Sequence, residues 1–214
     1  MKRRSFLQLG LFFLAGCAVP PQPVSTPHPN QIAALPMIPL TQPVACQPRL
    51  VAAPTLPAAN PSLDELDPNG LHVVNAKQVI ELDPLKYRLI ITGAVENPLQ
   101  LSLDDLRCMP KVTATVNLTC KGNFEDVTTY SGVPLLVLLE LARPRDAANS
   151  VYLTGADGYP GYVSKLDALE EDNFLAYEWK DEPLPIFHGF PVRAVMPTLS
   201  GYAWTKYLTE IRVE

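Results

Sequence analysis

Proline is concentrated in the first third of this chain. Thirteen of its 23 prolines lie between Pro20 and Pro68, in a sequence of 214 residues. Proline fixes φ and lacks a backbone N–H, so such a stretch builds neither a long helix nor an inner strand of a sheet. The sequence therefore predicts a disordered, proline-rich tether over residues 17–68, followed by one folded domain over residues 69–214.

The first seventeen residues have the layout of an export signal. A basic run, Lys2–Arg4, precedes a short apolar stretch, Leu9–Ala15, which is too short to span a bilayer. Arg-Arg-Ser-Phe-Leu-Gln resembles the twin-arginine motif, whose machinery exports folded proteins, although an ordinary basic n-region is the alternative. Leu-Ala-Gly-Cys, ending at Cys17, resembles a bacterial lipobox. We expect residues 1–16 to be a signal peptide, and Cys17 to be lipidated and to anchor the protein on the extracytoplasmic side of a bacterial membrane, periplasmic or cell-surface.

The charge balance bears on the class of partner. The net charge is −5, and the only basic block lies at the very start of the chain. An acidic chain of this kind is not expected to bind nucleic acid.

The residue pattern after Leu71 predicts a β-rich domain. Val112, Ala114, Val116 and Leu118 alternate with polar residues, which is typical of a half-buried strand over Lys111–Cys120. Ser102-Leu-Asp-Asp has the pattern of a helix N-terminus, and Pro134–Ala142 has that of a core helix. Further strands are predicted at residues 86–95, 151–154, 161–164, 174–179, 192–196 and 207–213. This order favours an α+β fold with mixed sheets.

Few residues in this domain have a pattern that indicates chemistry. The chain has no HExxH, CxxC, GxSxG or phosphate-binding glycine motif. Cys120 lies at a predicted strand end before a glycine turn, and taken alone a buried structural cysteine is the simpler interpretation. His188 and Arg193 flank a Gly/Pro loop and suit an anion such as phosphate, whereas the alternative is a loop histidine and a surface arginine.

Taken together and in order, segments from Asp83 to the C-terminus resemble the molybdopterin-binding oxidoreductase domain of the sulfite oxidase family. The segments are Asp83–Leu89, Leu101–Leu106, Asn117–Asn123, Gly132–Leu135, Gly161–Ser164, His188–Arg193 and Lys206–Leu208. The resemblance implies a β-rich, mixed-sheet fold of the sulfite-oxidase type and a molybdenum–molybdopterin cofactor.

The resemblance also implies roles for individual residues. Cys120 would be the catalytic residue and the molybdenum ligand, because a thiolate is a soft and strongly donating ligand. His188, Arg193 and Lys206 would hold the pterin phosphate. The implied cofactor-binding set is Cys120, Gly122, Asn123, His188, Arg193, Gly201 and Lys206. Tyr162 and Tyr202 are candidates for shaping the pocket, with ordinary packing as the alternative for both.

The chain departs from the family pattern next to the cysteine. Sulfite-oxidising members have basic residues after the Cys-x-Gly-Asn run, where this chain has Phe124-Glu125-Asp126. Carboxylates near the metal would repel sulfite, a dianion, so sulfite oxidation is disfavoured. The upstream segment, residues 71–82, also lacks the arginine that is usual in the family.

Two functions remain open. The first is oxygen-atom transfer on a neutral or cationic small molecule or protein side chain, with electrons exchanged with a separate partner protein. The alternative is a cofactor-free binding or scaffold lipoprotein that keeps the fold without catalysis. Outside the cytoplasm spare thiols often pair, so Cys46 and Cys108 are predicted to form a disulfide, with two independent free thiols as the alternative.

Overall fold

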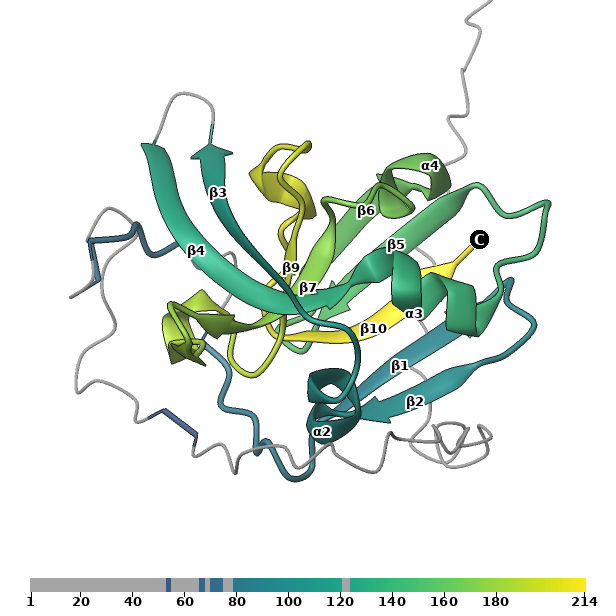
Figure 1. Ribbon diagram of the computed structural model, residues 1–214, viewed down its shortest axis with the longest axis horizontal. Coiled ribbons are helices and arrows are strands. Elements are labelled where there is room, and N and C mark those ends of the chain that lie inside the picture. Colours follow the sequence, from purple (N-terminus) through teal and green to yellow (C-terminus); the bar gives the residue numbers. More distant parts are fainter. Residues whose placement is uncertain (1–52, 55–65, 68–69, 75–78, 121–123) are drawn as a thin grey trace, which may run out of the picture. The chain divides into compact units, whose positions relative to one another are not determined.

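A computed structural model describes residues 53–54, 66–67, 70–74, 79–120 and 124–214 (Figure 1). The tether is therefore largely outside the described residues, as are Cys17, Cys46, Gly122 and Asn123. None of the described helices reaches the length and hydrophobicity needed to span a bilayer.

The first sheet has five strands in the order β2-β1-β10-β5-β6. Their bounds are β1 Arg88–Gly93, β2 Leu99–Ser102, β5 Ser150–Gly155, β6 Pro160–Ser164 and β10 Leu208–Val213. β1 pairs with β10 in parallel and every other pair is antiparallel, so the sheet is mixed. Buried and more exposed residues alternate along β1, β2 and β5, which places one face of the sheet on the core.

The second sheet is antiparallel and carries a long pair of strands. β3 (Val112–Cys120) pairs with β4 (Phe124–Pro134), which pairs in turn with β7 (Phe174–Trp179). The short strands β8 (Glu182–Pro183) and β9 (Arg193–Val195) both pair with β7. In Figure 1 the arrowhead of β3 marks the end that carries Cys120, beside the start of β4.

Short helices connect the strands. α2 (Leu103–Arg107) begins at Ser102 with the reciprocal capping box that the sequence predicts, since Ser102 and Asp105 each bond the other's backbone N–H. α3 (Leu135–Ala142) follows Pro134 and buries Leu135, Leu138, Leu139 and Ala142 in the core. The remaining helices among the described residues are α4 (Lys165–Ala168) and the 3₁₀ turns η1 (Ile186–His188) and η2 (Gly201–Ala203).

The expected fold class is confirmed: the domain is α+β, β-rich and built on two sheets, one of them mixed. β3 keeps the predicted alternation, with Val116 buried and Thr115 and Asn117 exposed. The sequence did not predict β4, whose apolar residues do not alternate with polar ones.

Candidate functional site

Cys120 is the last residue of β3 and lies opposite Phe124 in the register of the β3–β4 pair. Gly201, the first residue of η2, lies against this strand end. A Cβ added to Gly201 would sit 3.6 Å from Leu118 Cδ1 and 3.7 Å from the carbonyl oxygen of Thr119. The fold therefore brings η2 beside the end of the strand that carries Cys120, as the resemblance requires.

The segment from η1 to β9 positions His188 and Arg193. Gly189 ends η1 with φ +101°, and a Cβ there would approach Lys206 to 3.0 Å. Glycine therefore supplies both the left-handed turn and the close approach. Arg193 then begins β9, paired with Ala176 of β7. The segment before β10 runs alongside, because the N–H of Ala194 donates to the carbonyl of Thr205.

Three of the predicted residues line one cavity of about 300 Å³: Arg193, Gly201 and Lys206. Leu118 and Phe124, which precede and follow the turn after Cys120, also line it. Aromatic side chains form much of the rest, including Tyr202. Tyr162, by contrast, is not among its lining residues, and its ring lies against Tyr152 on the first sheet. A smaller space of about 30 Å³ is lined by His188 together with Arg193 and Lys206.

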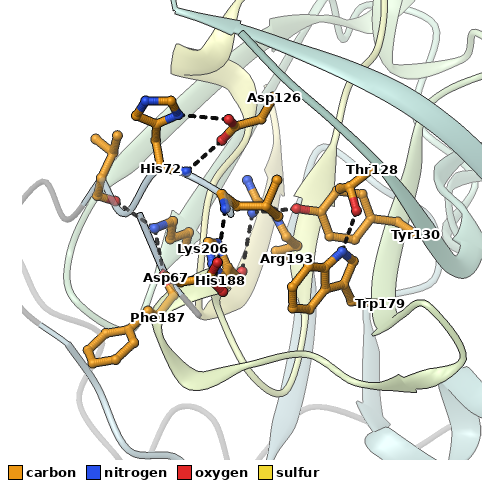
Figure 2. Close-up of polar contacts among 12 residues, drawn as sticks. Asp67, His72, Asp126, Thr128, Tyr130, Trp179, Phe187, His188, Arg193 and Lys206 are labelled. Carbon is orange, nitrogen blue, oxygen red and sulfur yellow. Dashed lines mark hydrogen bonds and ion pairs between the residues drawn. The ribbon is translucent and has the colours of Figure 1, made fainter. Parts of the chain in front are cut away.

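Arg193 is buried with only neutral partners. Its side chain is 2% exposed. The guanidinium donates to Tyr130 Oη at 3.2 Å and to the carbonyl oxygen of His188 at 3.3 Å (Figure 2). It also donates to the carbonyl oxygen of Trp204 at 3.5 Å. Among the described residues it forms no ion pair with a carboxylate. A buried guanidinium without a counter-charge favours binding of an anion.

Lys206 adds a second positive charge at the same cavity, whose lining also includes the carboxylate of Asp157. Its Nζ donates to the carbonyl oxygens of Val74 and Phe187, at 2.6 Å each. Desolvation, and to a lesser degree the neighbouring Arg193, lower the pKa of Lys206 to about 7. An anion bound beside Lys206 would favour its protonated form.

His188 is also buried, but it already has an acidic partner. Its Nε2 lies 3.1 Å from Oδ2 of Asp67, which belongs to the segment upstream of the domain's first strand. Burial, followed by the charges of Lys206 and Arg193, lowers the pKa of His188 to about 4, although Asp67 opposes this shift. His188 is therefore neutral at physiological pH in this structure.

A second carboxylate–histidine pair, His72 with Asp126, lies at the edge of these cavities. Asp126 accepts the backbone N–H of His72 at 2.9 Å, and its other oxygen lies 2.8 Å from Nδ1 of the same residue. The imidazole stacks on Phe124, with ring centroids 4.6 Å apart. Figure 2 shows this pair beside the group formed by Asp67, His188 and Lys206.

The structure adds residues to the predicted set and leaves part of that set undescribed. Asp67, His72, Phe124 and Asp126 contact or line the same cavities and were not assigned to the site from the sequence. Phe124 and Asp126 were noticed only as departures from the family pattern, and no signal in the sequence pointed to Asp67. Gly122, Asn123 and Cys17 lie outside the described residues, and Cys120 is described by its backbone alone.

Fold and site together define a domain that presents one strand-end cysteine and a cationic cavity, and comparison with known proteins identifies its family. Residues 76–214 match the family model described as oxidoreductase molybdopterin binding domain. This match covers more than half of the chain, which therefore belongs to that family.

Individual relatives agree with this assignment. Mouse mitochondrial sulfite oxidase is 34% identical over 170 residues, covering 65% of this chain and 31% of the enzyme. A protein of Azospira oryzae, provisionally named a protein-methionine-sulfoxide reductase subunit, is 29% identical over 136 residues, covering 64% of this chain and 52% of that protein. The chain thus spans about half or less of the length of these two relatives.

The fold also matches a solved structure. The sulfane dehydrogenase SoxCD from Paracoccus pantotrophus aligns with a TM-score of 0.61 and 23% sequence identity, over 92% of this chain and 55% of that chain. At this identity the match shows the fold alone.

The cofactor of this family is molybdenum held by molybdopterin, and the residues present fit it. The observation that tests the fit is the uncompensated guanidinium of Arg193, with Lys206, at a cavity in the size range of small-molecule sites. Both side chains suit the phosphate of the pterin, and Cys120 ends the adjacent strand.

Proposed function

We propose that this chain is an extracytoplasmic, lipid-anchored oxidoreductase that removes the oxygen atom from a neutral S-oxide group on a small molecule or a protein side chain. The observation that carries the proposal is the cavity beside Cys120 with two cationic groups, Arg193 and Lys206, at its wall. The bound cofactor would supply the two-electron redox chemistry. A separate redox protein would supply the electrons.

The chain's own residues would hold the cofactor and form the walls of the substrate site. Arg193, Lys206 and His188 would hold the pterin phosphate, and the backbone at Gly201 would let the cofactor approach closely. Cys120, with Gly122 and Asn123 in the turn after it, would hold the metal side. Phe124 and Tyr202 would form apolar walls that exclude water from the substrate.

A neutral substrate is supported by the charges next to the turn. Asp126 is 7% exposed and lines the smaller space, and Glu125 precedes it. These carboxylates, close in sequence to the proposed metal ligand, would repel a dianion such as sulfite. The name of the Azospira relative includes methionine sulfoxide, which is an S-oxide of the neutral kind proposed.

Metal analysis tests the proposal. Protein exported from a bacterial host that makes the cofactor is expected to contain about one molybdenum per chain and to oxidise reduced viologen when methyl phenyl sulfoxide is added. Cys120→Ser should remove the activity, and Cys17→Ser should release the protein from the membrane fraction. Folded, exported protein without molybdenum would contradict the proposal.

A cofactor-free binding domain is the second candidate, and one observation favours it. Asp67 already partners His188, and the Val74 carbonyl already accepts from Lys206, so the upstream segment satisfies two of the implied phosphate ligands. The same metal analysis separates the two candidates, since this one expects no molybdenum in the exported protein.

A further inference from the structure

We propose that His72, oriented by Asp126, is the catalytic acid of this site and passes a proton to the oxygen that leaves the substrate. This inference rests on the proposed function, because it names the proton donor for the same S-oxide. It begins from a pair of residues at the cavity edge, of which Asp126 lies where sulfite-oxidising members of the family have basic residues.

The geometry of the pair leaves one ring nitrogen available. One carboxylate oxygen of Asp126 accepts the backbone N–H of His72 at 2.9 Å, and the other lies 2.8 Å from Nδ1 of its ring. These two contacts fix the ring in one orientation. The Phe124 ring stacks within 13° of parallel and limits rotation. Nε2 makes no hydrogen bond to any described residue, and the side chain is 32% exposed, so Nε2 can exchange protons with water.

The position of the pair relative to the metal-bearing strand also supports this role. Phe124 is the direct cross-strand neighbour of Cys120, and opposite residues in an antiparallel pair lie about 5 Å apart. His72 is therefore separated from that strand end by one aromatic ring. His72, Phe124 and Asp126 line the space of about 30 Å³, which has room for one water molecule or one substrate oxygen.

Several other polar groups of the two cavities are already held by partners. Arg193 does not deprotonate, and Lys206 is held by two backbone carbonyls and is assigned to the pterin phosphate. Asp157, which also lines the larger cavity, already accepts the N–H of Tyr159. His188 is 3% exposed and already bonded to Asp67. Burial raises the pKa of Tyr130 and Tyr207 above the usual tyrosine value.

The proton is required by the balance of the reaction. An S-oxide, two protons and two electrons give the sulfide and one water: the S–O bond breaks, sulfur keeps an electron pair, and oxygen leaves as water. The reduced redox partner supplies both electrons. One proton passes from Nε2 of His72, which is recharged from solvent, and the second comes from solvent directly. Asp126 accepts the hydrogen bond from Nδ1–H of His72, so that this proton stays on the imidazole, and it stabilises the imidazolium; it is therefore a positioning residue.

His72→Asn separates a catalytic role from a structural one. An asparagine amide can donate to Asp126 as Nδ1–H does, but it offers nothing in place of Nε2. With the molybdenum content unchanged, we expect kcat for methyl phenyl sulfoxide to fall by about 100-fold or more while KM changes little.

Added imidazole should raise the rate of His72→Ala by at least about ten-fold and should not raise the rate of Cys120→Ser. Asp126→Asn should lower kcat by about 10-fold, whereas Asp146→Asn, an exposed carboxyl-to-amide control, should leave it unchanged.

Each outcome decides the inference. Activity of His72→Asn within two-fold of the unmodified protein overturns it, as does loss of activity without imidazole rescue or with loss of molybdenum. Nitrogen NMR of the metal-free protein gives a readout that needs no cofactor. Neutral His72 must carry its proton on Nδ1, and a proton on Nε2 with Nδ1 bare would overturn the inference. A metal-free exported protein with the Nδ1–H form would contradict the proposed function and leave the orientation of His72 confirmed.

Discussion

The carboxylate of Asp67 lies 3.1 Å from Nε2 of His188, and the two residues are 121 positions apart in the chain. Both side chains are almost completely buried. Asp67 also accepts the N–H of Leu71 at 2.9 Å, so a single carboxylate ties the chain around residues 67–71 to the wall of the cationic cavity. This part of the chain, which precedes the first strand, is therefore part of the site.

Replacing this carboxylate should destabilise the metal-free domain. Asp67→Asn keeps the shape of the side chain but weakens its bonds to His188 and to the backbone of Leu71. Because the site is buried, we expect the free energy of unfolding to fall by about 1–3 kcal/mol. Urea denaturation measures this, with Asp146→Asn as an exposed control. A change below about 0.5 kcal/mol would show that Asp67 does not hold the segment in place.

His188 should make the stability of the metal-free protein depend on pH. Its folded pKa of about 4 lies below the ordinary value of 6.5, so between these values the unfolded chain binds more protons than the folded one. Stability should therefore rise from pH 4 to pH 6.5 and decline as the pH falls through this window, by at most about 3 kcal/mol. His188→Gln should remove this part of the slope in denaturation curves. An unchanged slope would mean that other groups produce it.

Strands β3 and β4 show how much of the fold could be predicted from the sequence. β3 was predicted because its apolar residues alternate along Val112–Cys120. β4 was missed because the apolar residues of Phe124–Pro134 do not alternate with polar ones, and it is a strand because β3 and β7 pair with it from both sides.

The candidate site likewise contains residues that could be predicted from the sequence and residues that could not. Arg193 was named from the residue pattern and a resemblance, and Gly201 and Lys206 from the resemblance alone; the structure places all three around one cavity. Asp67 and His72 could not be placed there, because their partners lie 121 and 54 residues away and only the folded chain brings them together. Nothing local in the sequence distinguishes these side chains from solvated ones.

Gly201 allows the cofactor contacts to be tested without disturbing the fold. A methyl group there would meet Leu118 and the Thr119 carbonyl only at 3.6–3.7 Å, which is ordinary contact. Gly201→Ala should therefore change the unfolding free energy by less than about 0.5 kcal/mol while lowering the molybdenum content of exported protein, since the methyl projects toward the end of β3. Gly161→Ala is the matched contrast, because its methyl would overlap Thr205 Oγ1 and should destabilise the domain. Full molybdenum in Gly201→Ala would remove Gly201 from the cofactor contacts.

Cys108, the residue that ends α2, is disulfide-bonded. We predict that its partner is Cys46, which lies outside the described residues, so that the bond fastens the tether to the domain. This pairing matters for function, because a bond to Cys120 would remove the thiolate proposed for the metal. Cys46→Ser should leave Cys108 open to alkylation without reductant and should lower the unfolding free energy by about 2–4 kcal/mol, since the lost cross-link closed a long loop. Peptide mapping under non-reducing conditions identifies the partner directly, and a Cys108–Cys120 peptide would overturn both the pairing and the role of Cys120.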